Sequence, residues 1–421
     1  ELSRREGQPG AEVMLTLDMG LQEYIAKRLG EESASVVVMD VRSGDVLAMV
    51  SKPSYDSNDF NRGLSTKEWK ALVNNERSPL INKSIAGVYP PGSIFKMVVL
   101  LAALEKGVVT PSYKIFCSGE YELGEAKFHC WKRHGHGFVD GTEAITESCD
   151  VYFYEIAKRT GIDRIAAMAR KFGLNSASGI DLPGEQGGLI PTRGWKRAAR
   201  DQPWHQGETV IAGIGQGFVL LTPLQMALMT ARLANGGRAI VPHLTRSVGT
   251  SVTEKTQSID VPSLNIPPGH LKLVTDAMNR VVNHPRGTAR RSATGIEEFP
   301  MAGKTGTVQV RRITKAERDA GVRKNKDMPW KHRDHALFVG FAPVDNPRYA
   351  ISVVVEHGGG GSSVAAPIAS DVMAEAYRRN SAGPGAGIAG AAPQQNTTTD
   401  TRAEEDVERP TTIAQDEGGQ T

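Results

Sequence analysis

The sequence predicts one α/β domain whose β-sheet is formed by strands from both ends of the chain. Two β-branched runs lie near the N-terminus, within Ser33 to Ser51, and two more lie near the C-terminus, from Leu337 to Pro343 and from Tyr349 to Gly358. The sequence between these runs is mainly of helical pattern. Strands at both ends with helices between them favour a single sheet that joins the two ends.

The predicted elements follow from turn and cap residues. Arg42-Ser43-Gly44-Asp45 separates the first two runs and Asp345-Asn346-Pro347 the last two, so each pair is predicted to be a hairpin. Helices are predicted over Met97 to Lys106 and over Val151 to Phe172. A third begins at Thr222-Pro223, where Thr is the N-cap and Pro the first helical residue.

The composition is that of a globular protein. The chain has 421 residues, 39% hydrophobic and 23% charged, which suffices for one large domain or two ordinary ones. Its 50 Lys and Arg against 47 Asp and Glu give a net charge of +3, too balanced to indicate a nucleic-acid partner. No stretch approaches the roughly 18 apolar residues of a membrane span, and the N-terminus has no signal-peptide pattern. Because the sequence starts without Met and runs straight into domain-like sequence, we expect a fragment whose targeting segment lies upstream.

Three segments are expected along the chain. Residues 1–12 are interpreted as the remnant of an upstream linker and residues 13–380 as the domain. Residues 381–421 contain no aromatic residue and no Leu. Such a segment cannot bury a core, so we predict a disordered, low-complexity tail.

Lys96 is the one charged residue in the apolar stretch that follows Pro90-Pro91-Gly92. Burying an ammonium group without a partner is costly. Ser93 lies three residues earlier, on the same face of one helical turn, and a desolvated lysine can act as a general base beside a hydroxyl. Alone, the pattern favours a simpler interpretation, in which Ser93 caps the helix and Lys96 extends to solvent.

Two further motifs follow in order. Ser148-Cys149-Asp150 precedes a helical pattern, and alone it would be an N-cap cluster. Lys304-Thr305-Gly306-Thr307 begins an alternating strand, in which Gly allows another backbone to approach and Lys and Thr can hold a carboxylate. Alone, this would be an ordinary edge strand. Together, Ser-x-x-Lys, Ser-x-Asp and Lys-Thr-Gly indicate a serine acyl-transfer site.

With these motifs the chain resembles the penicillin-binding transpeptidases, and within them the class B, elongation-type group. The likeness runs from Val13 to Arg379, through AGVYPPGSIFKM, FHCWKRHGHG, GIDLPGEQGGLIPT, AGIGQGFVLLTPLQMA, MAGKTGTVQV and VVEHGGGGSSVAAP. It implies the fold shared with serine β-lactamases, a five-stranded antiparallel sheet sandwiched by helices. It also implies work at the periplasmic face of the inner membrane, with the anchor outside this fragment.

The resemblance implies D,D-transpeptidation of peptidoglycan stem peptides without a catalytic cofactor. Ser93 would attack the carbonyl between two D-alanines, Lys96 would take its proton, and Ser148 would relay a proton to the leaving group. An amine from a second stem peptide would then resolve the acyl-enzyme. The backbone N–H groups of Ser93 and Thr307 would form the oxyanion hole.

The third motif is implied to bind the substrate's terminal carboxylate. Lys304, Thr305 and Thr307 would hold it beside Gly306, and the charge of Lys304 would help lower the pKa of Lys96. Asp150 stands where Asn is commoner in the wider family, although the elongation-type group also carries Asp. If Asp150 acts mainly through hydrogen bonds, Asp150→Asn is expected to keep acylation within about tenfold.

The implied partners are stem peptides, β-lactam antibiotics, a membrane glycosyltransferase and other elongation proteins. Three related enzyme classes stay open: a β-lactamase, a β-lactam sensor and a D,D-carboxypeptidase. A class A β-lactamase would add a Glu-x-x-Leu-Asn-type segment, which is not found between Asp150 and Lys304. A non-enzymatic cell-wall scaffold is the remaining alternative.

Two loops invite functional interpretations. Glu356 to Ser363 is glycine-rich but lacks the Gly-Lys-Ser/Thr ending of a phosphate loop, so a flexible turn is favoured. Arg311 to His335 carries nine Lys and Arg against four Asp and Glu. It is expected to be a solvated loop, or else a contact for anionic wall polymer or a partner protein.

All three cysteines lie within 33 residues, in the order Cys117, Cys130, Cys149, with His136 between the last two. The spacing lacks the close pairs of a zinc finger. However, Cys149 lies inside the second motif, so a closed structural zinc site of three cysteines and one histidine would support Ser148 and Asp150 from behind. His129 or His134 could replace His136, and buried cysteines without a role, or one disulfide, are the simpler alternatives.

Overall fold

A five-stranded antiparallel sheet forms the centre of the protein, seen here in a computed structural model that describes residues 7, 9–249, 251–252, 261–311, 317 and 320–381. Its spatial order is β10-β11-β12-β2-β3. The strands are β2 (Ala34–Asp40), β3 (Val46–Lys52), β10 (Ala302–Val308), β11 (His335–Ala342) and β12 (Tyr349–Val355). Both predicted hairpins are confirmed.

The sheet joins the two ends of the domain through β2 and β12. They pair along their whole length, from Tyr349 opposite Asp40 to Val355 opposite Ala34. β2, β11 and β12 lie inside the sheet and are almost wholly buried, whereas the edge strand β3 alternates between buried and half-buried residues. Strands that are covered on both faces are expected to be apolar along nearly their whole length, whereas a strand with one solvated face alternates between apolar and polar residues. The burial patterns agree with this expectation.

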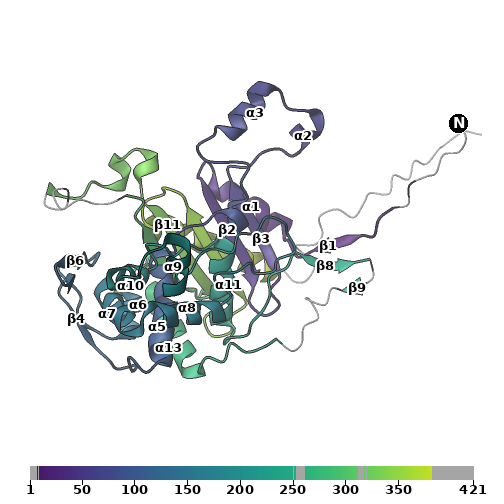
Figure 1. Ribbon diagram of the computed structural model, residues 1–421. Helices are drawn as coiled ribbons and strands as arrows, with labels where there is room; N and C mark the ends of the chain where they lie inside the picture. Colours follow the sequence, from purple (N-terminus) through teal and green to yellow (C-terminus); the bar gives the residue numbers. More distant parts are fainter. Residues whose placement is uncertain are drawn as a thin grey trace, which may run out of the picture.

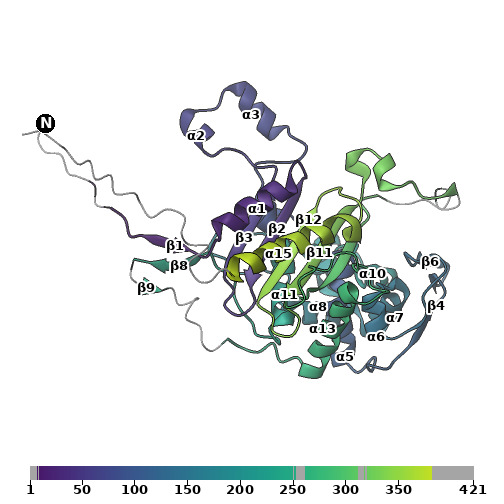
Figure 2. The same cartoon turned by 180° about the vertical axis from the view of Figure 1, so that it is seen from behind.

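Helices cover both faces of the sheet (Figures 1 and 2). α1 (Met19–Leu29) and α15 (Ala366–Ser381) pack together over one face. α11 (Pro223–Ala234) packs on β2, β11 and β12 from the other. α11 begins as predicted, with Thr222 as N-cap in a capping box with Gln225 and Pro223 at the first helical position.

A largely helical region next to the sheet surrounds α5 (Lys96–Glu105), which is apolar and buried along nearly its whole length. The 3₁₀ turn η1 (Gly92–Phe95) leads into α5. α5 packs on α6 (Gly141–Thr146), α7 (Asp150–Thr160), α8 (Ile162–Lys171) and α13 (Pro268–Asn283), and the region also contains α9 (Arg193–Arg200) and α10 (Gln206–Ala212).

The single helix predicted over Val151 to Phe172 is wrong, because Gly161 divides it into α7 and α8. Gly161 has φ +82°, a conformation that ends a right-handed helix. α8 therefore starts in a new direction and packs on α5.

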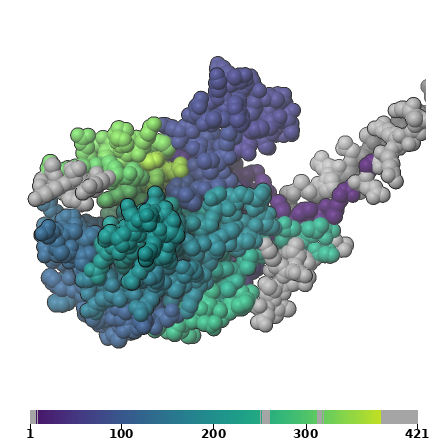
Figure 3. Space-filling model, in the orientation of Figure 1, coloured from purple at the N-terminus to yellow at the C-terminus, as the bar shows by residue number. Residues whose placement is uncertain are grey.

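Several short strands and helices lie outside the central sheet and the helices that pack on it. Two hairpin-like pairs lie beside α7, β4 (Ile115–Cys117) with β7 (Gly137–Val139) and β5 (Glu120–Leu123) with β6 (Ala126–His129). β1 (Val13–Leu15), β8 (Thr245–Val248) and β9 (Ser251–Val252) form a separate small sheet. α2 (Asn58–Arg62) and α3 (Thr66–Val73) stand out from the body as a lobe (Figure 3), and α4 (Lys83–Ala86) follows.

The glycine-rich segment after β12 is only partly the flexible turn that was predicted. Its last residues form a π-helical turn, η4 (Gly361–Ala365), which continues into α15. In the basic segment between β10 and β11, the described residues include two 3₁₀ turns, η2 (Asn325–Asp327) and η3 (Trp330–His332). The predicted disordered tail lies outside the described residues, apart from Ser381 at the end of α15. Among the helices that the structure describes, none has the length and apolar character needed to cross a membrane.

Candidate active site

Ser93 lies in η1, immediately before the buried helix α5. Gly92 precedes it with φ +55°, a left-handed conformation that favours glycine. A Cβ at Gly92 would lie 3.3 Å from the carbonyl oxygen of Thr307, so η1 sits directly against the end of β10. The first and third motifs are therefore brought together, with Ser93 half-buried at their junction.

Lys96 is fully buried and points toward the second motif rather than to solvent. Its Nζ lies 2.7 Å from Oδ1 of Asp150, which is an ion pair, and donates to the carbonyl oxygen of Ser148 at 2.9 Å and to its Oγ at 3.3 Å. Among the described residues, no hydrogen bond joins Lys96 Nζ to Ser93. The simple interpretation of a lysine that extends to solvent is thus wrong, because a carboxylate and two oxygens of Ser148 satisfy the buried ammonium.

Ser148 lies between the two lysines. Its Oγ accepts a hydrogen bond from Lys304 Nζ at 2.9 Å, in addition to the bond from Lys96. The residue has φ +57°, a left-handed conformation that costs about 1 kcal/mol or more outside glycine and asparagine. The turn directs the Ser148 hydroxyl into the site just before Asp150 begins α7.

Lys304 is also fully buried, on β10. Burial, and then the nearby charge of Lys96, hold the pKa of Lys304 well below its ordinary value, while Asp150 opposes the shift. Asp150 is paired directly with Lys96 at 2.7 Å, and the same carboxylate favours the charged form of Lys304. The expected effect of the Lys304 charge on Lys96 stays a prediction.

Hydrogen bonds from neighbouring segments fix the two threonines of the third motif. Thr305 Oγ1 lies 2.8 Å from Oγ1 of Thr288, and Thr307 Oγ1 accepts a hydrogen bond from the backbone N–H of Gly361 at 3.1 Å. A Cβ at Gly306 would lie 3.0 Å from the carbonyl oxygen of Pro91. The sequence predicted that Gly306 allows another backbone to approach closely. That backbone is the segment that precedes Ser93.

Two residues that the sequence interpretation missed contact these motifs. Thr288 follows α13 and bonds to Thr305, as described above. Trp131 donates its backbone N–H to Oδ2 of Asp150 at 2.9 Å and its indole N–H to the carbonyl oxygens of Glu147 and Ser148 at 3.1 and 3.0 Å. Trp131 directly follows Cys130 and lies within FHCWKRHGHG, a segment that carries the family resemblance, but neither signal indicated which residues it contacts.

The three cysteines and His136 come together behind the second motif. One ligand atom from each of Cys117, Cys130, His136 and Cys149 lies within 4.8 Å of the others. The thiols are free and buried. His129 and His134, the alternative ligands, are exposed and do not belong to this group. The cluster joins the β4–β7 pair to the start of α7.

The donor set fits a tetrahedral zinc ion. Zinc bonds of about 2.3 Å to sulfur and 2.0–2.1 Å to nitrogen imply ligand separations of roughly 3.5–3.8 Å. Nδ1 of His136 lies 3.6 Å from Sγ of Cys117 and 3.6 Å from Sγ of Cys130. Hydrogen bonds from Cys130 and then Cys149 lower the pKa of Cys117 to about 3. This favours a thiolate at Cys117, the form that binds metals, whereas hydrogen bonds with Cys117 and Cys130 raise the pKa of Cys149.

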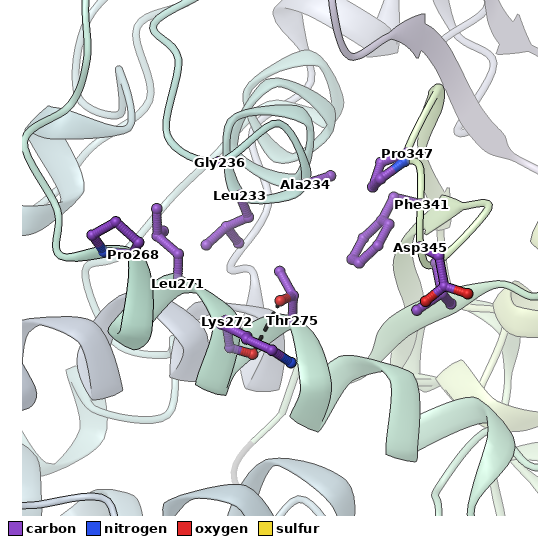
Figure 4. A pocket seen from close by; sticks show the side chains of 11 residues that line it. Leu233, Ala234, Gly236, Pro268, Leu271, Lys272, Thr275, Phe341, Asp345 and Pro347 are labelled. Atoms are coloured by element: carbon purple, nitrogen blue, oxygen red, sulfur yellow. Dashed lines mark hydrogen bonds between the residues drawn. The ribbon is translucent and has the colours of Figure 1, made fainter.

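A separate cavity of about 260 Å³ has no part in this site. It lies between the end of α11, the start of α13 and the turn after β11, and Leu233, Leu271 and Phe341 line it (Figure 4). Phe341 pairs with Ala302, whereas Thr307 pairs with Ala336. The cavity is therefore displaced along the sheet from the residues that meet Ser93.

Comparisons with known proteins agree on one family. The family described as "Penicillin binding protein transpeptidase domain" matches residues 34–374. The chain is 39% identical over 378 residues to peptidoglycan D,D-transpeptidase MrdA of Haemophilus influenzae and 40% identical over 361 residues to MrdA of Escherichia coli K12, covering 88% and 85% of this chain. It spans only 57% and 56% of the length of these relatives.

Solved structures agree with the sequence relatives. PBP2 of Pseudomonas aeruginosa is 41% identical with a TM-score of 0.78, over 88% of this chain and 79% of that one. PBP2 of Helicobacter pylori, solved as a complex with MreC, is 34% identical with a TM-score of 0.76, over 87% and 64%.

Proposed function

Because the chain belongs to the penicillin-binding protein transpeptidase family, we propose that it is the catalytic domain of a peptidoglycan D,D-transpeptidase that cross-links stem peptides during cell elongation. The observation that carries the proposal is a continuous buried chain of interactions from Asp150 through Lys96 and Ser148 to Lys304. It runs from the start of α7, through Lys96 at the start of α5, to the strand of the third motif. Such an arrangement can move a proton between a nucleophile and a leaving group.

In the proposed reaction, Ser93 Oγ attacks the carbonyl carbon between two D-alanines of a stem peptide. Lys96 accepts the hydroxyl proton, and Ser148 passes a proton to the amine of the departing D-alanine. The C–N bond breaks and an ester to Ser93 remains. For Lys96 to act as the base its amine must be neutral, and the Asp150 carboxylate, 2.7 Å from Nζ, can accept the proton that leaves it.

The substrate's terminal carboxylate is assigned to the third motif. Gly361 donates to Thr307 Oγ1, so the hydroxyl proton of Thr307 is free to be donated to a carboxylate. The Thr305 hydroxyl, which bonds to Thr288, and the amine of Lys304 complete the cradle. A bound carboxylate would also favour the charged form of Lys304, against the effect of burial.

The ester is resolved by an amine from a second stem peptide, which forms the cross-link. Water at the same position would make the protein a carboxypeptidase, or a β-lactamase when the ester comes from a β-lactam. The sequence offers no class A water-activating segment between Asp150 and Lys304. We therefore assign a transpeptidase that is inhibited by β-lactams.

Intact-mass spectrometry over time after addition of penicillin tests this proposal. One acyl group should appear on Ser93 and stay for many minutes, and Ser93→Ala should abolish it. Rapid release of hydrolysed drug would support a β-lactamase instead. Folded protein that is never labelled would support a scaffold. Transfer of a donor peptide to an added amine, in preference to water, separates transpeptidase from carboxypeptidase.

We also propose that Cys117, Cys130, His136 and Cys149 hold a structural zinc ion. Four protein ligands close the coordination shell, so the ion supplies folding energy and no reaction step. Cys130 accepts a hydrogen bond from the backbone N–H of Asp150 at 3.4 Å, and Cys149 lies between Ser148 and Asp150. The ion would therefore fix the backbone of the second motif.

The cellular setting is part of the proposal. The Helicobacter structure is a complex of PBP2 with MreC, and another neighbour, 33% identical, belongs to a peptidoglycan synthase complex that coordinates polymerization and crosslinking. By analogy, this domain works at the periplasmic face of the inner membrane with a glycosyltransferase and other elongation proteins. Affinity purification of the membrane-anchored protein would test these partners.

A further inference from the structure

Trp131 combines an exposed ring with three hydrogen bonds directed into the site. The residue is 61% exposed, yet its indole N–H lies within hydrogen-bond distance of the carbonyl oxygens of Glu147 and Ser148. Its backbone N–H donates to Oδ2 of Asp150. One residue on the cysteine-bearing segment thus contacts both polar members of the second motif.

The indole bond acts on a strained part of the backbone. Ser148 has φ +57°, and a serine stays in that conformation only where its surroundings hold it there. Two donors meet at its carbonyl oxygen: Lys96 Nζ at 2.9 Å and Trp131 Nε1 at 3.0 Å. Lys96 takes part in the proposed proton transfer, so its bond changes during the reaction. The indole N–H does not titrate and can hold the carbonyl throughout.

The left-handed turn at Ser148 places its side chain as well as its carbonyl group. If this turn opened, the Cα–Cβ bond would change direction and Oγ would leave its place between Lys304 at 2.9 Å and Lys96 at 3.3 Å. Two contacts hold the segment that carries Trp131. The Trp131 ring meets the ring of His136 edge-on, with 5.7 Å between the ring centres, and Cys130 Sγ accepts a hydrogen bond from the backbone N–H of Asp150. The cysteine cluster and the proton path therefore meet at this residue.

We propose that Trp131 is a positioning residue for Ser148 and Asp150. Its indole N–H keeps the left-handed turn at Ser148 closed, so that the hydroxyl stays between the two lysines, and its backbone N–H fixes the orientation of Asp150. The inference rests on the proposed function, since it assigns a role within the same acylation reaction.

The test separates the indole N–H from the bulk of the ring. Trp131→Phe keeps an aromatic ring and the backbone N–H but removes the indole donor. Replacement of Trp131 alone by 3-benzothienylalanine, in which sulfur takes the place of the N–H, keeps the shape more closely. Phe138→Leu is the matched control, because Phe138 is 69% exposed on β7 of the same region and its ring contacts Phe116 instead.

For each protein we would measure the acylation rate constant and the dissociation constant of the preceding complex with a chromogenic β-lactam, together with metal content and melting temperature. We expect both Trp131 variants to lose about tenfold or more in the acylation rate constant, because Ser148 is misdirected. The dissociation constant should change less than about threefold. Metal content and melting temperature should match those of the parent, and Phe138→Leu should acylate normally.

Two results would overturn the inference. Acylation at the parent rate in the benzothienylalanine protein would show that the indole N–H has no positioning role. If both Trp131 variants acylate slowly but have also lost metal and thermal stability to a similar extent, Trp131 only supports the fold. Parent protein that is never acylated would contradict the proposed function itself, which keeps the two failures distinct.

Discussion

Asp150 accepts hydrogen bonds on both of its carboxylate oxygens, from Lys96 Nζ at 2.7 Å and from the backbone N–H of Trp131 at 2.9 Å. The wider family commonly has Asn at this place, and an amide has only one acceptor oxygen. This geometry alters the expectation that Asp150→Asn would be mild. In the variant, either Lys96 or Trp131 would face an NH₂ group.

We therefore predict that Asp150→Asn slows acylation by more than tenfold. Leaving a buried donor unsatisfied costs about 1–3 kcal/mol, and more when the group is charged. The pH–rate profile should change shape as well, because the titratable carboxylate that pairs with Lys96 has been removed. Acylation kinetics of both proteins between pH 5 and 9 check this, and a loss smaller than tenfold with an unchanged profile would contradict it.

Gly361→Ala should disturb the third motif, because η4 lies against β10. A Cβ at Gly361 would lie 2.2 Å from the carbonyl oxygen of Gly306 and 2.5 Å from that of Leu337. Neither backbone atom can move freely, so overpacking should destabilise the protein by about 1–3 kcal/mol. The Gly361 N–H would also shift away from Thr307, which should weaken binding of carboxylate-bearing substrates. Denaturant unfolding and the dissociation constant for a β-lactam measure the two effects.

Gly360→Ala is the control for this prediction. A Cβ at Gly360 would meet only Oγ of Ser363 at 2.9 Å, the end of a side chain that can rotate. Unfolding and binding should stay near the parent values. Equal effects of the two substitutions would show that the segment responds to any added side chain, and that the contact with β10 is not the cause.

The sequence carried enough information for the sheet and the motif residues, for identifiable reasons. The strands of the two hairpins are runs of β-branched residues with turn residues between them, and this local pattern is sufficient to locate them. Lys96 stood out because a charge in an apolar helix needs a partner. The break at Gly161 was missed because a single glycine is often tolerated within a helix, and only the backbone reveals its φ of +82°.

Other features of the site depend on contacts between distant segments. Thr288 bonds to Thr305, yet nothing in the sequence around Thr288 indicates which residue it meets. The left-handed conformation of Ser148 also has no signal in the local sequence, and the donors that meet at its carbonyl oxygen, Lys96 and Trp131, come from other segments. The cysteine cluster was predicted as a group because its members have few alternatives in a chain with three cysteines.

His335 should make the protein sensitive to acid. Burial, and then the nearby charge of His357, lower the pKa of His335 from 6.5 to about 4. Its Nδ1 accepts a hydrogen bond from the backbone N–H of His357 at 2.9 Å, which requires the neutral ring. The unfolded chain therefore binds the proton more readily than the folded one. Stability is fully present above pH 6.5 and falls as the pH drops from 6.5 to about 4, by up to about 3 kcal/mol.

His335→Asn tests this dependence, because Asn can accept the same backbone hydrogen bond and does not titrate. The free energy of unfolding, measured by denaturant at intervals from pH 7.5 to 4, should fall less steeply in the variant than in the parent. If the free energy of unfolding falls equally steeply with pH in the variant and the parent, groups other than His335 cause the acid sensitivity. Acylation at pH 7 should be retained, since His335 lies at the start of β11, outside the three motifs.

The last prediction concerns the metal. Protein purified without chelator should contain about one zinc ion per chain, because the four ligand atoms are already gathered within 4.8 Å and binding needs little rearrangement. Cys130→Ser should lose the ion and lower the melting temperature by about 5 °C or more. It should also slow acylation, since Cys130 accepts from Asp150 and precedes Trp131. His134→Ala, which removes an exposed histidine outside the cluster, should retain zinc and activity. Parent protein that contains no zinc, together with a Cys130→Ser variant of parent stability and rate, would leave the cysteines as packing behind the second motif.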